Sequence, residues 1–285
     1  MKRRVLLSLV LTLALGALQP GTGSAEGTLI LGVHPFLPAT SLLPKFEPLA
    51  EHLGRSLGRP VRVEISRDYE DHIRRVGSGE VDIAYMGPAS YVKLVGTYGE
   101  FRQLARLEIK GNPTFHGVIF VRNDSPIQTL EEIAGKRFAF GSPTSTMGTL
   151  VPRHVLQQAG VGLENLGGFS ALSNHDNIAL AVLVGDFDAG AVKEETFSKY
   201  QPRGLRSLAV TPSISEHLFV AAADLPADTV AEVRKILLRT GEDEEGLEVL
   251  RSIKETVSRL VPVEDGDYDN LRRILSEVEK AEVSP

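Results

Sequence analysis

The chain has 285 residues, no cysteine, and 37 acidic against 31 basic side chains, which give a net charge of −6 at neutral pH. The absence of cysteine excludes disulfides, thiolate metal sites, c-type haem, cysteine nucleophiles and a membrane anchor on a lipidated cysteine. An acidic chain is also a poor binder of nucleic acid, because binding to the phosphate backbone depends on clustered Lys and Arg.

The first 25 residues have the pattern of a secretory signal peptide. Residues 1–4 are basic (MKRR), the 14 residues 5–18 are mostly apolar, and small residues follow up to Ala25. The apolar run is shorter than the ~20 residues of a membrane-spanning helix, which disfavours a membrane anchor. We expect cleavage after Ala25 and a mature protein free in the periplasm. The leader holds three basic and no acidic residues, so its removal changes the net charge from −6 to −9 and leaves 260 residues, enough for one large domain or two of ordinary size.

The mature sequence alternates strand-like and helix-like segments. Apolar runs and period-2 alternation predict strands at 28–33, 61–65, 81–85, 118–121, 137–140, 188–192, 205–210 and 218–222. Apolar residues at helical spacing predict helices at 42–53, 71–76, 130–134, 147–159, 177–184, 230–238 and 268–278. Such alternation predicts a parallel, doubly wound α/β arrangement, in which ligands lie beyond the carboxyl ends of the strands.

The segment GSPTSTMG at 141–148 joins a predicted strand to a predicted helix. Thr144, Ser145 and Thr146 are all favourable helix N-cap residues. The first N–H groups of a helix lack internal partners and carry positive partial charge, so hydroxyls beside them form an anion site. An ordinary capped loop is the alternative, but three consecutive hydroxyls between two glycines favour a ligand site. No Lys-Ser/Thr pair follows the second glycine, so this is not a nucleotide P-loop.

A second candidate is SNHD at 173–176, directly before the predicted helix at 177–184. His175 could donate to an anionic ligand, or it could lie at the surface while Ser173 or Asp176 caps the helix. A serine hydrolase is not expected, because the GxSxG elbow is absent and the adjacent His175 and Asp176 would point apart. No metal site is expected either, because the histidines, including His34, His52, His72 and His116, show no ligand spacing.

In the order and spacing of its motifs, the chain resembles the phosphonate-, phosphate- and phosphite-binding periplasmic components of ABC transporters. The resemblance covers most of the mature chain and rests on GVHP (32–35), VDIAYMG (81–87), SPIQTL (125–130), GKRFAF (135–140), SPTSTMG (142–148), HDNIALAV (175–182) and PVEDGDYDNLR (262–272). It implies two α/β lobes of the type II periplasmic binding proteins, joined by two crossover strands with the ligand between them. Lobe 1 would comprise 26–112 and 208–285, and lobe 2 would comprise 113–207.

The resemblance also implies a set of ligand contacts. The family's Ser-Thr-Ser grip falls on Ser145, Thr146 and Met147, next to Thr144. The family's histidine falls on His175, and the family's tyrosine after the second strand falls on Tyr69. The family's aromatic pair falls on Tyr85 and Met86. The first of two family carboxylates falls on Glu195, and the second falls on His217, beside Glu216. Met147, Met86 and His217 therefore depart from the family pattern, which favours a plain oxyanion or a ligand with one anionic head over an aminoalkylphosphonate.

These observations predict a periplasmic solute-binding protein that captures a small oxyanion for an ABC importer. Its partner would be the permease at the inner membrane, and we expect a monomer that is not an enzyme and needs no cofactor, metal or nucleic acid. The alternative is a sensing protein with the same fold, which presents its ligand to a membrane histidine kinase or chemoreceptor.

Overall fold

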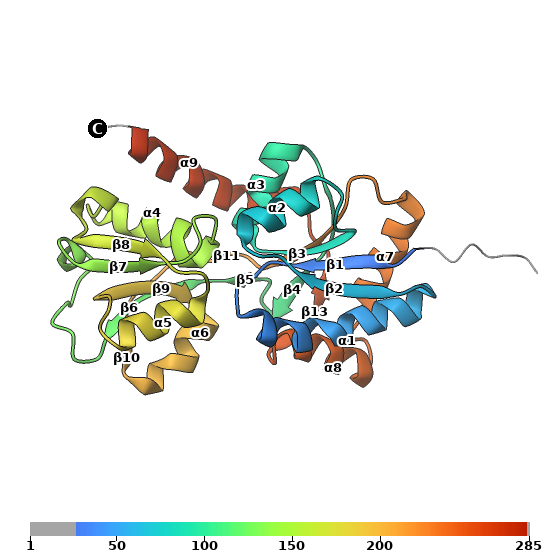
Figure 1. The fold of residues 1–285 in the computed structure, drawn as a ribbon, viewed down its shortest axis with the longest axis horizontal. Coiled ribbons are helices and arrows are strands. Elements are labelled where there is room, and N and C mark those ends of the chain that lie inside the picture. Colours follow the sequence, from blue (N-terminus) through green and yellow to red (C-terminus); the bar gives the residue numbers. More distant parts are fainter. Residues whose placement is uncertain (1–26, 284–285) are drawn as a thin grey trace, which may run out of the picture.

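The computed structural model describes residues 27–283, so the predicted signal peptide, 1–25, lies outside the described residues. Two sheets flanked by helices form two lobes, which two short strands connect (Figure 1). This arrangement confirms the predicted α/β class with two lobes. Within the described residues, no helix is long and apolar enough to cross a membrane.

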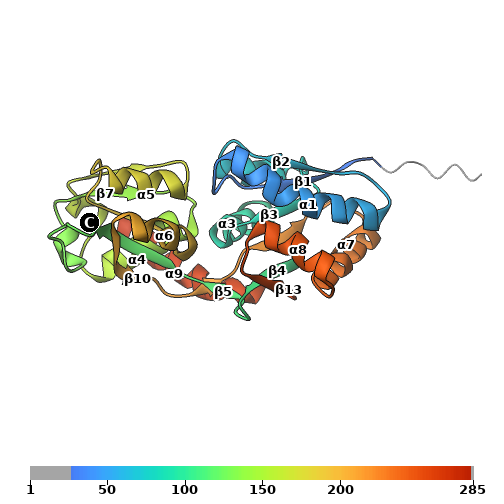
Figure 2. The same cartoon turned by 90° about the horizontal axis from the view of Figure 1, so that it is seen from below.

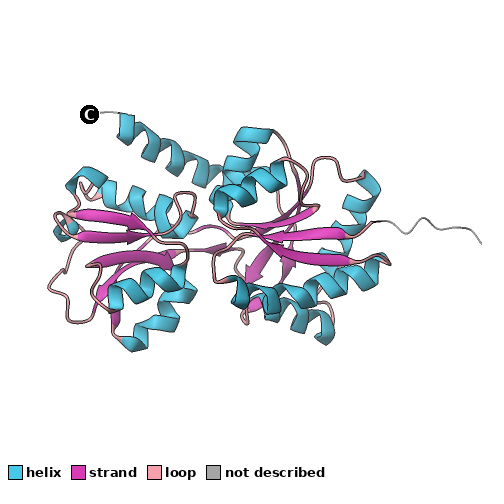
Figure 3. Cartoon of the chain, viewed as in Figure 1, coloured by secondary structure: helices cyan, strands magenta, loops and turns pink. Residues whose placement is uncertain are grey.

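The first lobe is built on a six-stranded sheet in the order β13-β4-β12-β3-β1-β2. Its strands are β1 Leu29–Val33, β2 Val61–Ile65, β3 Ile83–Met86, β4 Arg102–Ile109, β12 Leu218–Ala221 and β13 Val257–Val261. Helices α1 Ala39–Leu57, α7 Ala227–Arg239 and α8 Glu244–Ile253 pack on one face, and α2 Tyr69–Gly77 and α3 Pro88–Tyr98 pack on the other (Figure 3). Each face has its own buried apolar cluster, as expected of a sheet that is covered on both sides.

The second lobe is built on a five-stranded sheet in the order β10-β6-β9-β7-β8. Its strands are β6 Gly117–Arg122, β7 Arg137–Phe140, β8 Gly168–Ala171, β9 Ala189–Lys193 and β10 Leu205–Val210. Helices α5 His175–Leu183 and α6 Glu194–Tyr200 cover one face, and α4 Val151–Gln158 covers the other. A 3-10 turn, Glu131–Ile133, replaces the short helix expected at 130–134.

Both sheets are mixed, whereas the alternating pattern predicted parallel sheets. β1 is parallel to β2 and β3, and β7 is parallel to β8 and β9, but β12 and β6 run antiparallel to their neighbours. β6 and β12 each follow a passage between the lobes, where no helical crossover turns the chain back, and β13 is also antiparallel to β4. The sequence analysis also missed the helices α3, α6 and α8 and the strands β4, β8 and β13.

The chain passes between the lobes twice, through β5 Thr114–Phe115 and β11 Ile214–Ser215, which pair antiparallel (Figure 1). The expected limit of lobe 2 at 207 falls inside β10, which continues to Val210 in the second sheet. The C-terminal helix α9 Asp269–Val283 contacts α3 and also α4 of the second lobe, where His154 and Glu277 lie 3.4 Å apart. Figure 2 shows α9 beside this connection. The C-terminal segment therefore braces both lobes instead of belonging to the first alone.

Candidate ligand-binding cleft

The loop after β7 begins a helix in an unusual way. The Ser145 hydroxyl accepts the Gly148 N–H at 3.1 Å, and the first turn, Thr146–Leu150, is π-helical before α4 starts. Pro152 explains the wide turn, because it has no N–H to donate to the Gly148 carbonyl four residues earlier. That carbonyl instead accepts the Gly141 N–H at 2.8 Å. This hydrogen bond between the two glycines closes the loop and holds Ser145 at the helix start.

This loop meets the first lobe across the cleft between the lobes. The Thr146 hydroxyl oxygen accepts the Ala89 N–H, at the start of α3, at 3.0 Å. The Tyr69 phenol at the start of α2 interacts with the Ser145 hydroxyl: burial raises the pKa of Tyr69, and Ser145 partly offsets that rise. The three side chains Tyr69, Ser145 and Thr146 are buried. Helix starts, with their positive ends, therefore converge on one buried point from both lobes, which is an arrangement suited to an anion.

His175 starts α5 in the second lobe and is buried. The helix is capped by Asn174, whose side chain accepts the Asn177 N–H at 3.0 Å, and not by Ser173 or Asp176 as the sequence alternative held. The Nδ1 atom of His175 has no hydrogen-bond partner among the described residues. Burial, with smaller contributions from two nearby cationic groups, lowers the pKa of His175 to about 3, so the ring is neutral at pH 7. Asp176 pairs with Lys199, with 3.0 Å between a carboxylate oxygen and the ammonium.

His34 is a cleft residue that the sequence reading did not select. Its ring lies 5.0 Å from the ring of Tyr69, 5.7 Å from that of Tyr85 and 5.4 Å from that of His217, centroid to centroid. Both ring nitrogens are buried without a partner among the described residues. Burial, followed by repulsion from His217 and His72, holds the pKa of His34 well below its usual value. The sequence could have indicated His34 through its position directly after β1, because ligands bind beyond the carboxyl ends of the strands.

Tyr85 and His217 form part of the first-lobe wall of the cleft. Their rings stack with a 13° interplanar angle and 5.4 Å between centroids. Met86, the next residue in β3, points to the opposite face of the sheet and is buried in the cluster under α2 and α3, because successive strand residues alternate. Met147 packs beside Phe115 in a cluster behind the loop, and its side chain lines neither of the two cavities described below. Both methionines thus lie behind the candidate site.

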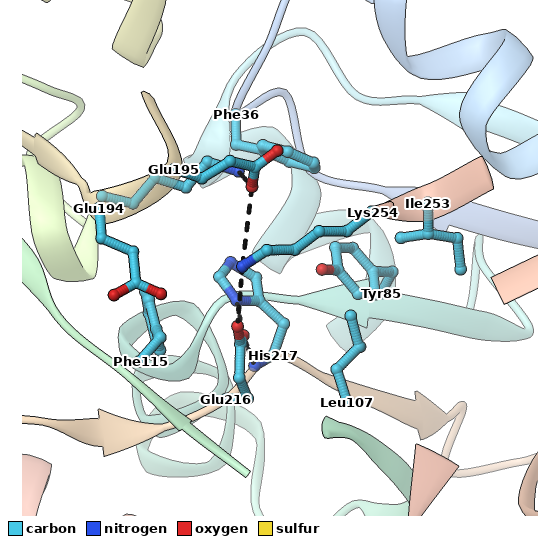
Figure 4. A pocket seen from close by; sticks show the side chains of 11 residues that line it. Phe36, Tyr85, Leu107, Phe115, Glu194, Glu195, Glu216, His217, Ile253 and Lys254 are labelled. Carbon is cyan, nitrogen blue, oxygen red and sulfur yellow. Dashed lines mark hydrogen bonds and ion pairs between the residues drawn. The ribbon is translucent and has the colours of Figure 1, made fainter. Parts of the chain in front are cut away.

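Ion pairs link four side chains at the inner end of the cleft, near β5 and β11, which we call the inner charge cluster: Lys193, Glu195, Glu216 and Lys254. Glu194 also lines this end of the cleft, as Figure 4 shows, and it pairs with His116. The Lys254 ammonium lies 3.7 Å from a Glu195 oxygen and 3.6 Å from a Glu216 oxygen. The Lys193 ammonium lies 3.2 Å from Glu195. Burial alone would raise the pKa of Glu216, but the hydrogen bond from His217 and the charges of His217 and Lys254 outweigh it and lower that pKa to about 2. The carboxylate is therefore ionised and compensated.

Two cavities flank the meeting point of the lobes. The outer one has a volume of about 560 Å³ and is lined by Tyr69, Ser142, Pro143, Asn174 and residues of the β1–α1 loop. Thr144 lies in the same loop, with its hydroxyl 3.4 Å from that of Ser142. The inner one, at the inner charge cluster, has a volume of about 10 Å³, which is room for about one water. Within residues 27–283, no three His, Cys, Asp or Glu side chains are placed to hold a metal ion.

The chain is similar in sequence and in fold to known proteins. A family model described as "ABC transporter, phosphonate, periplasmic substrate-binding protein" matches residues 31–268. The phosphate-import protein PhnD of Mycolicibacterium smegmatis is 28% identical over 289 residues, covering 91% of this chain and 89% of that protein.

Two solved structures share the fold. PhnD1 of Prochlorococcus marinus in complex with methylphosphonate superposes with a TM-score of 0.80 at 22% identity, covering 89% of this chain and 98% of that one. A binding protein component of an ABC phosphonate transporter from Pseudomonas aeruginosa has a TM-score of 0.83 at 21% identity, covering 90% and 88%.

Proposed function

Because the chain belongs to the family of periplasmic substrate-binding proteins of phosphonate ABC transporters, we propose that its cleft captures a small phosphorus oxyanion: phosphate, phosphite or a small phosphonate. The relatives named for phosphate import and solved with methylphosphonate support this ligand class. The observation that carries the proposal is the pairing of Ser145 and Thr146 with Tyr69 and Ala89 across the cleft, where helix starts from both lobes converge.

In this proposal the oxyanion enters between the two lobes at that point. The ligand oxygens accept hydrogen bonds from the hydroxyls of Ser145, Thr146 and Tyr69 and from the N–H of Ala89. These bonds replace the contacts that the four groups make with one another. Neutral His175 donates one ring N–H. Thr144 supports the loop, Tyr85 and His217 form the wall, and Glu195 lies at the inner end. Met86 and Met147 are left out, because their side chains pack in apolar clusters.

The number of donors is sufficient for useful affinity. A charge-assisted hydrogen bond contributes about 1.5–3 kcal/mol, so five or six give about 8–18 kcal/mol before the cost of association. That cost is at least several kcal/mol. A micromolar dissociation constant requires about 8 kcal/mol. Hydroxyls, helix N–H groups and His175 can therefore reach micromolar affinity without an arginine clamp.

Isothermal titration of the chain from residue 26 onward with phosphate, phosphite, methylphosphonate and sulfate tests this. We expect saturable heat with at least one phosphorus oxyanion at micromolar concentration, and loss of that heat in Ser145→Ala. Thr97→Ala, which removes an exposed hydroxyl of α3 outside the cleft, serves as the matched control. No heat and no thermal shift with any phosphorus oxyanion would refute the proposal.

We further propose that the protein is exported by cleavage after Ala25 and delivers its ligand by docking on an inner-membrane permease after the lobes close about β5 and β11. The family assignment supports the transport role. Sequencing the N-terminus of the exported protein should show Glu26 first. Small-angle scattering should show a smaller radius of gyration with ligand than without it, and identical curves would contradict closure.

A further inference from the structure

The inner charge cluster presents an electrostatic problem for an anion-binding cleft. Glu216 is almost fully buried, with 3% of its side chain exposed, and Glu195 faces it across the gap between the lobes. Both carboxylates are ionised, and both lie close to the wall formed by Tyr85 and His217. Uncompensated, they would repel an oxyanion held nearby, because charges interact strongly where water is excluded.

Lys254 is placed to neutralise both carboxylates. It follows α8 in the first lobe, its side chain is 14% exposed, and its ammonium lies between the two carboxylates, as Figure 4 shows. Glu195 belongs to the second lobe, so Lys254 pairs with a carboxylate from each side of the closed cleft. Lys193, with its ammonium 4.3 Å from the Phe36 ring centroid, gives the second positive charge. Lys193 and Lys254 thus balance Glu195 and Glu216 within the protein, while His217 also hydrogen-bonds Glu216 at 2.7 Å and Glu194 pairs with His116.

The same arrangement leaves little space for a ligand substituent. The inner cavity of about 10 Å³ is lined by Lys254, both carboxylates and the aromatic side chains of Phe36, Tyr85 and Phe115. It is too small for an aminoalkyl chain, and the ammonium that such a chain would bring is already supplied by Lys254. A buried carboxylate pair without its own lysine would be a binding site for a ligand cation.

We infer that Lys254 is a specificity-determining residue: it neutralises Glu195 and Glu216 from within the protein, so that the cleft accepts oxyanions with a small uncharged substituent and rejects those with an ammonium group. The inference rests on the proposed oxyanion function and names the substrate class within it. The favoured ligands are phosphate, phosphite and methylphosphonate, and the rejected class is the aminoalkylphosphonates.

The test is titration of the wild-type protein, Lys254→Met and Lys254→Arg with methylphosphonate and with 2-aminoethylphosphonate. We expect the wild type to bind methylphosphonate at least about tenfold more tightly, and Lys254→Met to shift the ratio of the two dissociation constants about tenfold or more toward the ammonium ligand. Lys254→Arg should keep the wild-type ratio, because it keeps the charge. Lys235→Met, on the exposed face of α7, is the matched control and should change neither constant.

Each result is decisive. A wild type that binds 2-aminoethylphosphonate as well as methylphosphonate overturns the inference without any variant, and so it remains testable even if Lys254→Met does not fold. Equal weakening of both ligands in a folded Lys254→Met also overturns it, since that is the behaviour of a purely structural ion pair. If neither ligand nor phosphate binds the wild type, the proposed function itself fails, and this outcome is distinct from a wrong preference.

Discussion

Replacing Gly148 by alanine tests whether the Ser145 hydroxyl contacts the ligand. A Cβ at 148 would lie 2.8 Å from the Ser145 hydroxyl oxygen and 3.2 Å from the Gly141 Cα. The hydroxyl must therefore turn away, which breaks its hydrogen bond to the Gly148 N–H. The Gly141 Cα and the Ser145 Cβ, at 3.2 and 3.3 Å, have to move by only a few tenths of an ångström. The substitution therefore displaces one proposed ligand contact without removing it from the chain.

Gly148→Ala has two opposing effects on the folding free energy and one effect on the dissociation constant of the ligand. Loss of the cap costs about 0.5–2 kcal/mol of folding free energy, and alanine in place of a helical glycine returns about 0.5–1 kcal/mol. The net effect then lies between a gain of about 0.5 kcal/mol and a loss of about 1.5 kcal/mol of stability. Loss of one charge-assisted hydrogen bond to the oxyanion costs about 1.5–3 kcal/mol, which is about a 10- to 150-fold rise in the dissociation constant.

The assay combines calorimetric titration of the best phosphorus oxyanion with urea unfolding. Gly96→Ala is the matched control, because it also lies in a helix and its Cβ would meet nothing within 4 Å. We expect the control to raise stability slightly and to leave the dissociation constant unchanged. A folded Gly148→Ala protein that binds like the wild type would refute the placement of Ser145 at the ligand.

Three further predictions concern the loop, its packing and acid stability. Thr146→Val should weaken oxyanion binding about tenfold in the same titration, since it removes one hydroxyl that would donate to the ligand. Met147→Ala should lower the unfolding free energy by about 2–5 kcal/mol in urea titrations, yet change the dissociation constant less than Thr146→Val does, because Met147 packs behind the site. Burial lowers the pKa values of His72 and His175 to about 3, whereas the unfolded value is about 6.5. The unfolded state therefore binds more protons between these values, so stability is full above pH 6.5 and falls below it, by up to about 1.4 kcal/mol per histidine per pH unit. A urea midpoint that is unchanged between pH 7.5 and 5.5 would contradict this.

Local patterns predicted much of the molecule because they depend on nearby residues. The strand periodicity of β2 and the apolar spacing of α1 appear in the sequence, and both elements form as expected. The hydroxyl run at 144–146 indicated a helix start, and Ser145 does cap one. The π-helical turn was not expected, because it requires Pro152 and Gly141 to act together on the Gly148 carbonyl.

Side-chain direction was the main limit on predicting the site. Tyr85 and Met86 are adjacent, and comparison of motifs selected both, but in a strand only one of them can face the cleft. His34 carried little local signal, since its role depends on ring contacts with residues from three other segments. Lys254 follows α8, a helix that the sequence reading missed, so no argument placed it near Glu195.

The sequence by itself determined the α/β class and the loop at 141–148 as a helix start rich in hydroxyls, because each depends on neighbouring residues. The tertiary structure decided which groups meet across the cleft. Thr146 and Ala89 are 57 residues apart in sequence, and Lys254 and Glu195 belong to different lobes. Such contacts depend on how two sheets are set against each other by β5, β11 and α9, and no local propensity contains that information.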